Sequence, residues 1–394
     1  RRCVYETDVG ALDESLAVLD GLPGSDAQAL RARVAGHVAF EQALETRIER
    51  GYRVAHHKEA PPTLAQILRE LPALARTHLA PVDQAAFAQP TRGLKNVPVV
   101  GAWLDHGTKT TSPVVAHFRK YGKFLMIGQR LESPTEAIVL SLGSLTDKQV
   151  VPTPRGRYRH DVAVGYDRTL RGFIDAQGGA LGGACLADGV WLDADSTRRF
   201  EAEMRRVVQH DPTLRDRVMG RPPVDANTSA GPFAMTDLGG AGARMLLAYV
   251  ERRPDDRWGT FSTLRAHEYA HVADIKRHLP ILRGLPASIA LLGRNGFSPA
   301  AVEMELERRA QLGAVVLARD PDLAVVEMMR ALPVTAKEPD VHDAGYRDGL
   351  ELMVRNIYAR PDLFPQIDRT KRIISQLDRL SPGQLRQAAN LALR

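Results

Sequence analysis

The spacing of apolar residues predicts that the chain begins with helices. Ser25 to Tyr52 and Thr63 to Leu79 carry apolar residues at helical intervals, and Pro72 is expected to bend the second helix. Residues 1 to about 88 are therefore expected to be helical. A further amphipathic run opens at Asp195-Ser196 and continues to about His210, which predicts a helix after the middle of the chain.

Between Val99 and Val164 the pattern changes to short apolar runs that are typical of strands, separated by turns rich in Gly, Pro, Ser and Thr. Arg221 to Gly242 is rich in Gly and Pro and is expected to form a long loop, whereas Met245 to Glu251 fits a strand or a helix. We therefore expect an α+β fold. Its regions are a helical N-terminal region (1–88), a strand-containing middle (99–235) and a mostly helical C-terminal region (236–394).

The sequence HEYAH, from His267 to His271, lies in the run Ser262 to Leu279, which contains neither Pro nor Gly. This run predicts one helix with Ser262 as the N-cap. Histidines four residues apart lie on one helix face, so both imidazoles can reach the same metal ion. Glu268, next to the first histidine, can deprotonate a water whose pKa zinc lowers to about 7. The motif predicts a hydrolytic zinc site.

A catalytic zinc needs a third protein ligand. The metzincin continuation is excluded, because Asp274 and Arg277 stand where it requires Gly and His. His278 lies on the same face as His271, but a straight helix cannot return it to the metal. A glutamate from a following helix is the usual alternative.

The run Ser298 to Leu317 predicts such a helix, with Ser298 as N-cap and Pro299 in the first position. Glu303 and Glu307 share a face of it, whereas Glu305 points away. We expect Glu307 to be the third ligand, with Glu303 as the alternative. A solvated face of Glu and Arg residues is the competing interpretation of this helix.

These residues resemble the gluzincin metalloproteases, whose metal ligands are the two histidines of HExxH and a downstream Glu. In those families the ligand Glu is commonly followed by a small residue three positions later and an acid or amide four positions later. Glu307, Ala310 and Gln311 are similar to this pattern. The eight residues from His267 to Asp274 are also similar to the HE[FY][GA]H-x-x-D helix of anthrax lethal factor-like peptidases. The resemblance implies a zincin-like catalytic part, bound Zn²⁺, a protein or peptide substrate, and a secreted or host-delivered bacterial toxin or effector.

Other residues are candidates for supporting roles. Asp274 lies on the metal face, where it could accept the second ring N–H of a ligating histidine, although an ordinary exposed Asp fits equally well. His342 and Tyr346, in a predicted polar turn that leads into a helix, are candidates for stabilising the oxyanion of a tetrahedral intermediate. Tyr358 is less favoured because it falls within an amphipathic run, where packing explains it.

Composition narrows the class of protein. The 394 residues are 44% hydrophobic and 25% charged, which is ordinary for a globular chain. The net charge is +6, but the aromatic fraction is only 6% and Arg residues alternate with acids, so no nucleic-acid partner is expected. The longest apolar runs, such as Met245 to Val250, are far shorter than the roughly 20 residues of a transmembrane helix.

The sequence leaves open how the chain is processed and whether its cysteines form a disulfide. The chain starts at Arg1 without Met or an apolar leader, as expected for a piece of a longer or processed protein. Cys3 and Cys185 are the only cysteines, and their pairing is not determined by the sequence.

The sequence therefore predicts a zinc endopeptidase in which His267, His271 and Glu307 bind the metal and Glu268 is the general base. Two alternatives remain at this point. The chain could be a catalytically degenerate zincin that binds peptides or proteins, or a zinc amidase that acts on a non-protein substrate.

Overall fold

The computed structural model describes residues 11–57, 60, 62–94, 96–99, 102–105, 112–130, 135–165, 183–186, 189–210, 213–226, 231–236, 240–278, 281–332 and 341–394. The chain forms two compact units, each built from separate stretches. The first unit comprises Arg1–Gln149, Asp161–Gly182 and Trp191–Asp195, and the second unit comprises Val150–His160, Gly183–Val190 and Ser196–Arg394. The predicted division into three regions stays a prediction.

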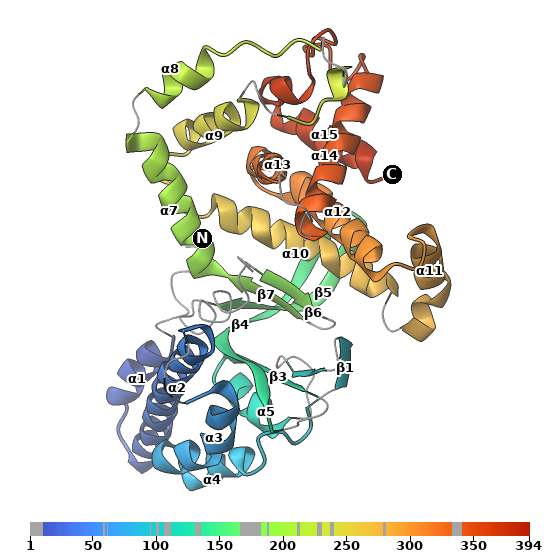
Figure 1. The fold of residues 1–394 in the computed structure, drawn as a ribbon. Helices are drawn as coiled ribbons and strands as arrows, with labels where there is room; N and C mark the ends of the chain where they lie inside the picture. Colours follow the sequence, from blue (N-terminus) through green and yellow to red (C-terminus); the bar gives the residue numbers. More distant parts are fainter. Residues whose placement is uncertain are drawn as a thin grey trace. The chain divides into compact units, whose positions relative to one another are not determined.

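The first unit begins with helices, as the apolar spacing predicts (Figure 1). Thr63 caps α3 by accepting a hydrogen bond from the backbone N–H of Gln66, and Pro72 lies inside this helix. Apolar side chains of α2, α3, α5 and β3 form one core, which includes Phe40, Leu71 and Phe118. The helices are α1 (Ala11–Asp20), α2 (Ser25–His57), α3 (Leu64–His78), α4 (Pro81–Gln84), the 3-10 helix η2 (Ala85–Phe87) and α5 (Pro113–Lys120).

The strands lie between Asn96 and Asp193 and form one sheet in the order β1-β2-β3-β4-β5-β7-β6. The pairs β1–β2, β2–β3 and β3–β4 are antiparallel. β4 runs well beyond the predicted end at Leu142, and β6 stands at the end of the order beside β7. The strands are β1 (Asn96–Val99), β2 (Ala102–Asp105), β3 (Lys123–Arg130), β4 (Ala137–Thr153), β5 (Gly156–Gly165), β6 (Gly183–Leu186) and β7 (Gly189–Asp193).

Helices follow the sheet and dominate the second unit, so the chain has a mostly helical α+β fold, as predicted. Its largest core joins the apolar faces of α12, α13, α14 and α15 and includes Leu312, Met328 and Met353. The helices are α7 (Ala194–His210), α8 (Leu214–Met219), η3 (Gly231–Phe233), α9 (Ala241–Arg252), α10 (Gly259–His278), α11 (Ile281–Arg294), α12 (Pro299–Leu317), α13 (Pro321–Arg330), α14 (Val341–Ala359), η4 (Ile374–Arg379) and α15 (Pro382–Ala392).

The start of α10 differs from the prediction. The helix begins at Gly259, so Ser262 lies within it and is not the N-cap. Glu201 of α7 accepts hydrogen bonds from the backbone N–H and the hydroxyl of Thr260, at 2.8 and 2.6 Å. A carboxylate that is distant in sequence therefore satisfies the free N–H of the first turn, which a local side chain would otherwise do.

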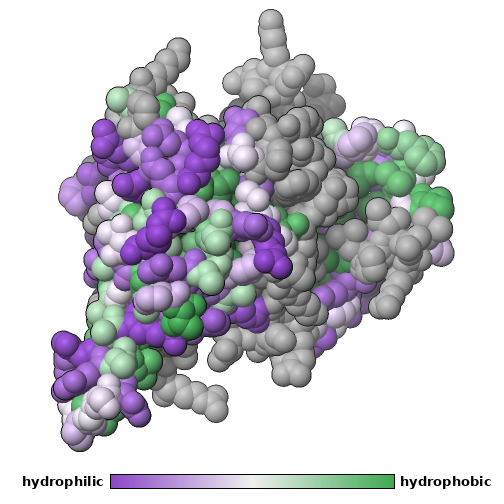
Figure 2. All heavy atoms as spheres, turned by 90° about the horizontal axis from the view of Figure 1, so that it is seen from below, coloured by the Kyte–Doolittle hydropathy of each residue, from purple (hydrophilic) through white to green (hydrophobic). Residues whose placement is uncertain are grey.

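Large apolar side chains are exposed near the C-terminal end of α11. Ile289 and Leu292 in the helix, and Phe297 just after it, are 53%, 37% and 69% exposed. In Figure 2 this region is the hydrophobic area at the right-hand edge, over α11. Within the described residues, no helix combines the length and the apolar character needed to cross a bilayer.

Candidate metal centre

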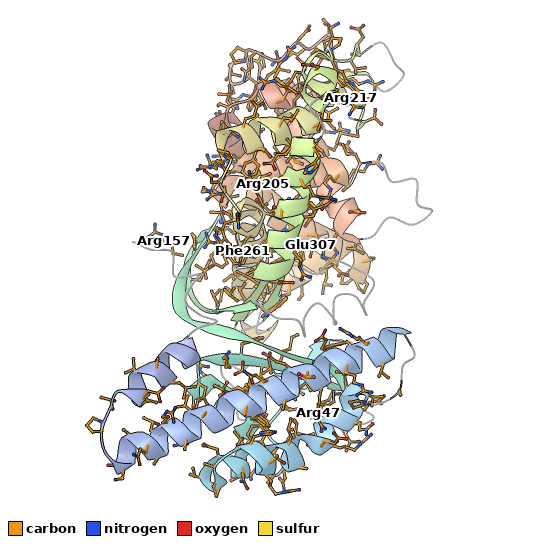
Figure 3. The ribbon with its side chains drawn as sticks, turned by 90° about the vertical axis from the view of Figure 1, so that its left-hand side faces the viewer. Arg47, Arg157, Arg205, Arg217, Phe261 and Glu307 are labelled. Atoms are coloured by element: carbon orange, nitrogen blue, oxygen red, sulfur yellow. The ribbon has the colours of Figure 1, made fainter. Side chains whose placement is uncertain are left out.

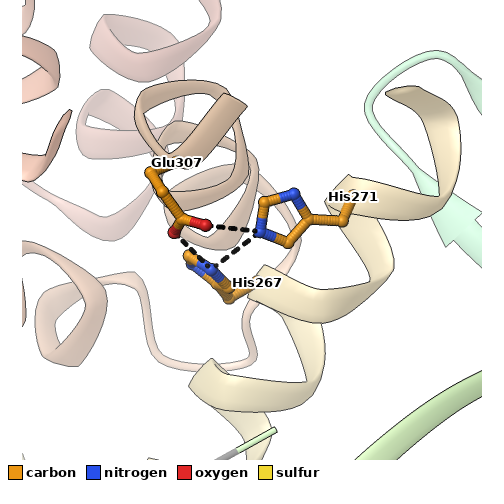
Figure 4. Close-up of side chains that lie close together, drawn as sticks. All are labelled: His267, His271 and Glu307. Carbon is orange, nitrogen blue, oxygen red and sulfur yellow. Dashed lines mark hydrogen bonds and ion pairs between the residues drawn. The ribbon is translucent and has the colours of Figure 1, made fainter. Parts of the chain in front are cut away.

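Helix α10 brings the two histidines of the HEYAH sequence together, as their spacing predicts. His267 and His271 lie one turn apart, with their Nε2 atoms 3.1 Å from each other and their rings 4.9 Å apart. His267 and the intervening Glu268 are buried, and His271 is half-buried. Both imidazoles therefore present the same nitrogen to one point beside the helix (Figure 4).

Glu307 of α12 faces this point. Its Oε2 lies 3.3 Å from Nε2 of His267 and its Oε1 lies 3.4 Å from Nε2 of His271. Close packing of the two helices makes this possible, because a Cβ atom on Gly313 of α12 would stand only 2.4 Å from Cβ of Ala270 on α10. Ser298 caps α12 and Pro299 is its first residue, as predicted. The structure thus brings together the three predicted metal ligands.

The spacing of the three ligand atoms fits a zinc ion. Ligands about 2.1 Å from a tetrahedral zinc lie about 3.4 Å from each other. In this site the two Nε2 atoms are 3.1 Å apart, and each lies 3.3 or 3.4 Å from a different oxygen of the Glu307 carboxylate, so the separations are close to that value. Oε2 of Glu307 is buried and accepts no hydrogen bond from the described residues, so it keeps a lone pair for a metal. Two imidazoles and one carboxylate are also a donor set that zinc prefers, and they leave a fourth position open.

The charges of the site attract cations. Burial opposes ionisation of Glu307, but the neighbouring His267 and His271 hold its pKa well below the usual value. Burial disfavours a charged His267, yet Glu307 and Glu268 raise its pKa to about 9. Burial raises the pKa of Glu268, which the neighbouring histidines oppose.

Gln311 fixes the orientation of His267. Its amide nitrogen donates hydrogen bonds to the carbonyl of Ala324 (2.9 Å) and to Oε2 of Glu327 (3.4 Å). The amide oxygen therefore faces Nδ1 of His267 at 2.9 Å and must accept the proton of that nitrogen. This bond leaves the lone pair on Nε2, the atom that faces Glu307. The sequence drew attention to Gln311 through its place after Glu307, but not to Glu327.

His342 and Tyr346 reach the site from α14. Nε2 of His342 lies 3.5 Å from Oε1 of Glu307, and the ring of Tyr346 lies 5.8 Å from the ring of His267. Burial and the nearby carboxylates raise the pKa of Tyr346 well above its usual value, so its hydroxyl stays protonated at neutral pH. The structure therefore places both predicted candidates beside the three ligands.

The local structure predicted for these two residues is wrong, because they lie in the first turns of α14 and not in a polar turn. Gly345, the residue that favoured the turn prediction, serves helix packing instead. A Cβ atom at this position would stand 2.8 Å from the carbonyl oxygen of Met304 and 3.0 Å from the backbone nitrogen of Arg308, both on α12.

The remaining candidates lie outside the three-ligand group. Glu303 is exposed on α12, and Glu305 pairs with Arg309. Asp274 is buried and accepts a hydrogen bond from Arg309 at 3.2 Å, and its predicted role toward a histidine stays a prediction. His278 and Tyr358 contact other residues: His278 lies near Ser288, and Tyr358 packs on Phe233.

Of the two cysteines, the structure describes Cys185. Cys185 of β6 is a free thiol, and burial raises its pKa. Cys3 lies outside the described residues. Among the described residues, His267, His271 and Glu307 form the one group of histidine, cysteine and acidic side chains whose geometry could hold a metal ion.

Comparisons with protein-family models, with curated proteins and with solved structures give no match to this chain. The functional argument therefore depends on the geometry of the site.

Proposed function

We propose that this protein is a zinc-dependent endopeptidase. The observation that carries the proposal is the convergence of the Nε2 atoms of His267 and His271 with the carboxylate of Glu307, a group that could hold a metal ion, with the buried Glu268 next to the first histidine. When bound, zinc lowers the pKa of a coordinated water to about 7 and polarises the carbonyl of the scissile bond.

Glu268 is the general base of the proposed reaction. Its carboxylate takes a proton from the attacking water while the water oxygen bonds to the carbonyl carbon, and then passes the proton to the amine nitrogen as the C–N bond breaks. Burial raises the pKa of Glu268, which moves the group toward the range in which a carboxyl can accept and return a proton near neutral pH.

Tyr346 and His342 are suited to stabilise the negative charge that develops on the carbonyl oxygen. The Tyr346 hydroxyl remains a donor at neutral pH because its pKa is raised, and His342 is 45% exposed, so that a bound substrate can reach it. Donors placed at the developing oxyanion contribute about 3–4 kcal/mol each to lowering a barrier of this kind.

β6 supports a peptide as the substrate. This strand contacts α10 and ends the order of the sheet, so one side of its backbone pairs with no further described strand of that sheet. An extended peptide can add to such an edge through backbone hydrogen bonds, which depend little on side-chain identity. This arrangement would lay a peptide bond along the helix that carries His267 and His271.

The test compares the wild type with Glu268→Gln in metal content and in cleavage of casein and a peptide library. We expect Glu268→Gln to keep one zinc per chain and to lose turnover by about 10²–10⁴-fold, because the variant lacks the base and keeps the ligands. Glu303→Gln is the matched control, since Glu303 is exposed on α12, and it should keep both zinc and turnover.

Wild-type cleavage by Glu268→Gln would contradict the mechanism. A wild-type protein that binds zinc and peptides without cleaving them would instead be a binding module. Zinc-dependent release of amines from peptidoglycan fragments, without cleavage of any peptide, would identify an amidase.

A further inference from the structure

A second site lies two helical turns before His267, between the N-terminal part of α10 and α7, α9 and α13. It is a cavity of about 350 Å³ in the second unit, and Figure 3 views this unit from the side of α7, on which Arg205 is labelled. Its walls are mainly apolar and include Met204, Leu246, Leu323 and Val326. A volume above about 300 Å³ with apolar walls is typical of small-molecule sites.

Glu327 of α13 is the acidic group that lines the interior of this cavity. Its side chain is half-buried, and its contact with Gln311 is a long hydrogen bond of 3.4 Å. The carboxylate therefore has acceptor positions left for a ligand. Burial raises its pKa to about 7, while Gln311 and the charges of His267 and Arg330 act in the opposite direction, so the group is largely ionised above neutral pH.

The other polar groups of the cavity are already engaged. The hydroxyl of Thr260 donates to Glu201, and the exposed Glu203 pairs with Arg206 at 2.6 Å. The guanidinium of Arg330 stands 4.6 Å above the ring of Phe200 at the exposed rim. Of the two carboxylates that line the cavity, Glu203 is thus paired with an arginine, whereas Glu327 has no Lys or Arg partner among the described residues, and its charge complements a cation.

We propose that this cavity binds an amphiphilic amine, with an apolar chain among Met204, Leu246 and Val326 and an ammonium group at the carboxylate of Glu327. The occupant is defined by two properties of the walls. The apolar side chains stabilise a hydrocarbon chain by about 0.8 kcal/mol for each CH₂ group that leaves water. The carboxylate selects a cationic head group over a neutral or an anionic one.

The proposal does not depend on the zinc chemistry, because the cavity does not include His267, His271 or Glu307. The amine and the metal would nevertheless act on a shared residue, since Gln311 joins Glu327 to His267. The binding experiment below therefore uses the full-length chain at a fixed zinc concentration, so that a change in metal content cannot be mistaken for a change in amine affinity.

The experiment is calorimetric titration at pH 8 with n-octylamine, n-octanol and n-octanoate. We expect octylamine to bind at least about tenfold more tightly than octanol, which corresponds to a charge-assisted hydrogen bond, and octanoate to bind most weakly. Glu327→Gln should reduce octylamine affinity about tenfold and change octanol affinity by less than about threefold. Glu203→Gln is the matched control at the rim and should leave both affinities nearly unchanged.

Val326→Trp fills the cavity and should remove the binding of octylamine and octanol alike. If this variant does not fold, Met204→Trp gives the same test, because Met204 is half-buried on the α7 side of the cavity. Tighter binding of octanoate than of octylamine would overturn the proposal. So would an octylamine affinity that neither Trp variant changes, an equal loss of octylamine and octanol binding in Glu327→Gln, or no binding of any probe.

Discussion

Each of the two units contains a pair of neighbouring histidines with two carboxylates nearby, and the two pairs are arranged differently. In the first unit, Nδ1 of His37 and Nε2 of His117 lie 3.2 Å apart, so one ring donates a hydrogen bond to the other. In the second unit, His267 and His271 instead turn the same nitrogen, Nε2, toward each other and toward Glu307.

Permanent cations neutralise the carboxylates of the first unit. Asp83 forms a two-pronged ion pair with Arg33, whose Nη2 donates at 2.6 Å, and Lys123 pairs with Glu41 at 2.6 Å. The histidines therefore gain little from a proton. Burial and the neighbouring His37 lower the pKa of His117 to about 4, so the His117 imidazole is neutral at pH 7.

The second unit has no such cation beside Glu307 among the described residues. The arginines that follow it are engaged with other acids, because Arg308 pairs with Asp348 and Arg309 pairs with Asp274 and Glu305. Among the described residues, the ion pairs of Glu307 are with His267, His271 and His342. The contrast indicates that two histidines and a carboxylate can offer a place for a metal ion where no Lys or Arg neutralises the carboxylate.

Removing the free carboxylate should have the largest effect on metal binding. Structural zinc sites with four ligands bind with about 10–16 kcal/mol, or roughly 2.5–4 kcal/mol for each ligand. We therefore expect Glu307→Ala to weaken zinc binding by about a few hundredfold, measured by competition with a chromogenic chelator, and to abolish cleavage.

Two controls sharpen this prediction. Glu303→Ala and Glu305→Ala change the same helix without touching the three-ligand group, and both should bind zinc as the wild type does. If Glu303→Ala loses zinc and Glu307→Ala retains it, the third ligand is Glu303, one helical turn before Glu307. Retention in all three variants would exclude this helix as a source of a ligand.

The first unit should respond to acid. Unfolded His has a pKa of about 6.5, whereas folded His117 has a pKa of about 4. Between these values the unfolded chain binds a proton that the folded chain does not, so the free energy of unfolding falls as the pH decreases from 6.5 to 4. The loss from this residue is at most roughly 3 kcal/mol.

The measurement is urea unfolding of the wild type and His117→Gln across this pH range. The variant keeps a polar partner for His37 but cannot take up the proton, so its stability should depend less steeply on pH. Equal slopes for the two proteins would show that His117 is not kept neutral, and the comparison between the two histidine pairs would fail.

Gln311 should have a smaller effect than Glu307, because it holds a ligand and is not one. Loss of the partner of a ligating histidine costs about 10–100-fold in metal affinity. We expect Gln311→Leu to fall in this range and to remain folded by circular dichroism. Zinc affinity equal to that of the wild type would mean that the bond between Gln311 and His267 does not orient the imidazole.

The parts of the site that depend on local geometry could be predicted from the sequence. The spacing of His267 and His271 places both on one face of any helix, and Ser298-Pro299 marks the start of α12 through capping chemistry. Helical periodicity placed Glu303 and Glu307 on one face of this helix, and it could not by itself decide between them. The mostly helical α+β class followed in the same way from the alternation of apolar patterns.

Features that depend on contacts distant in sequence could not be predicted. Glu201 of α7 determines where α10 begins, so Ser262 was wrongly expected to be the cap. Gly345 indicated a turn because glycine often does, but here it allows α14 to approach α12. The path from Glu327 through Gln311 to His267 joins three helices and leaves no pattern along the chain.

Zinc-edge anomalous diffraction from crystals of the full-length chain soaked in zinc tests the central claim most directly. We predict one strong peak, about 2.1 Å from Nε2 of His267, Nε2 of His271 and the carboxylate of Glu307, and no peak beside His37 and His117. A peak between His37 and His117, or no peak within reach of Glu307 at saturating zinc, would contradict the account.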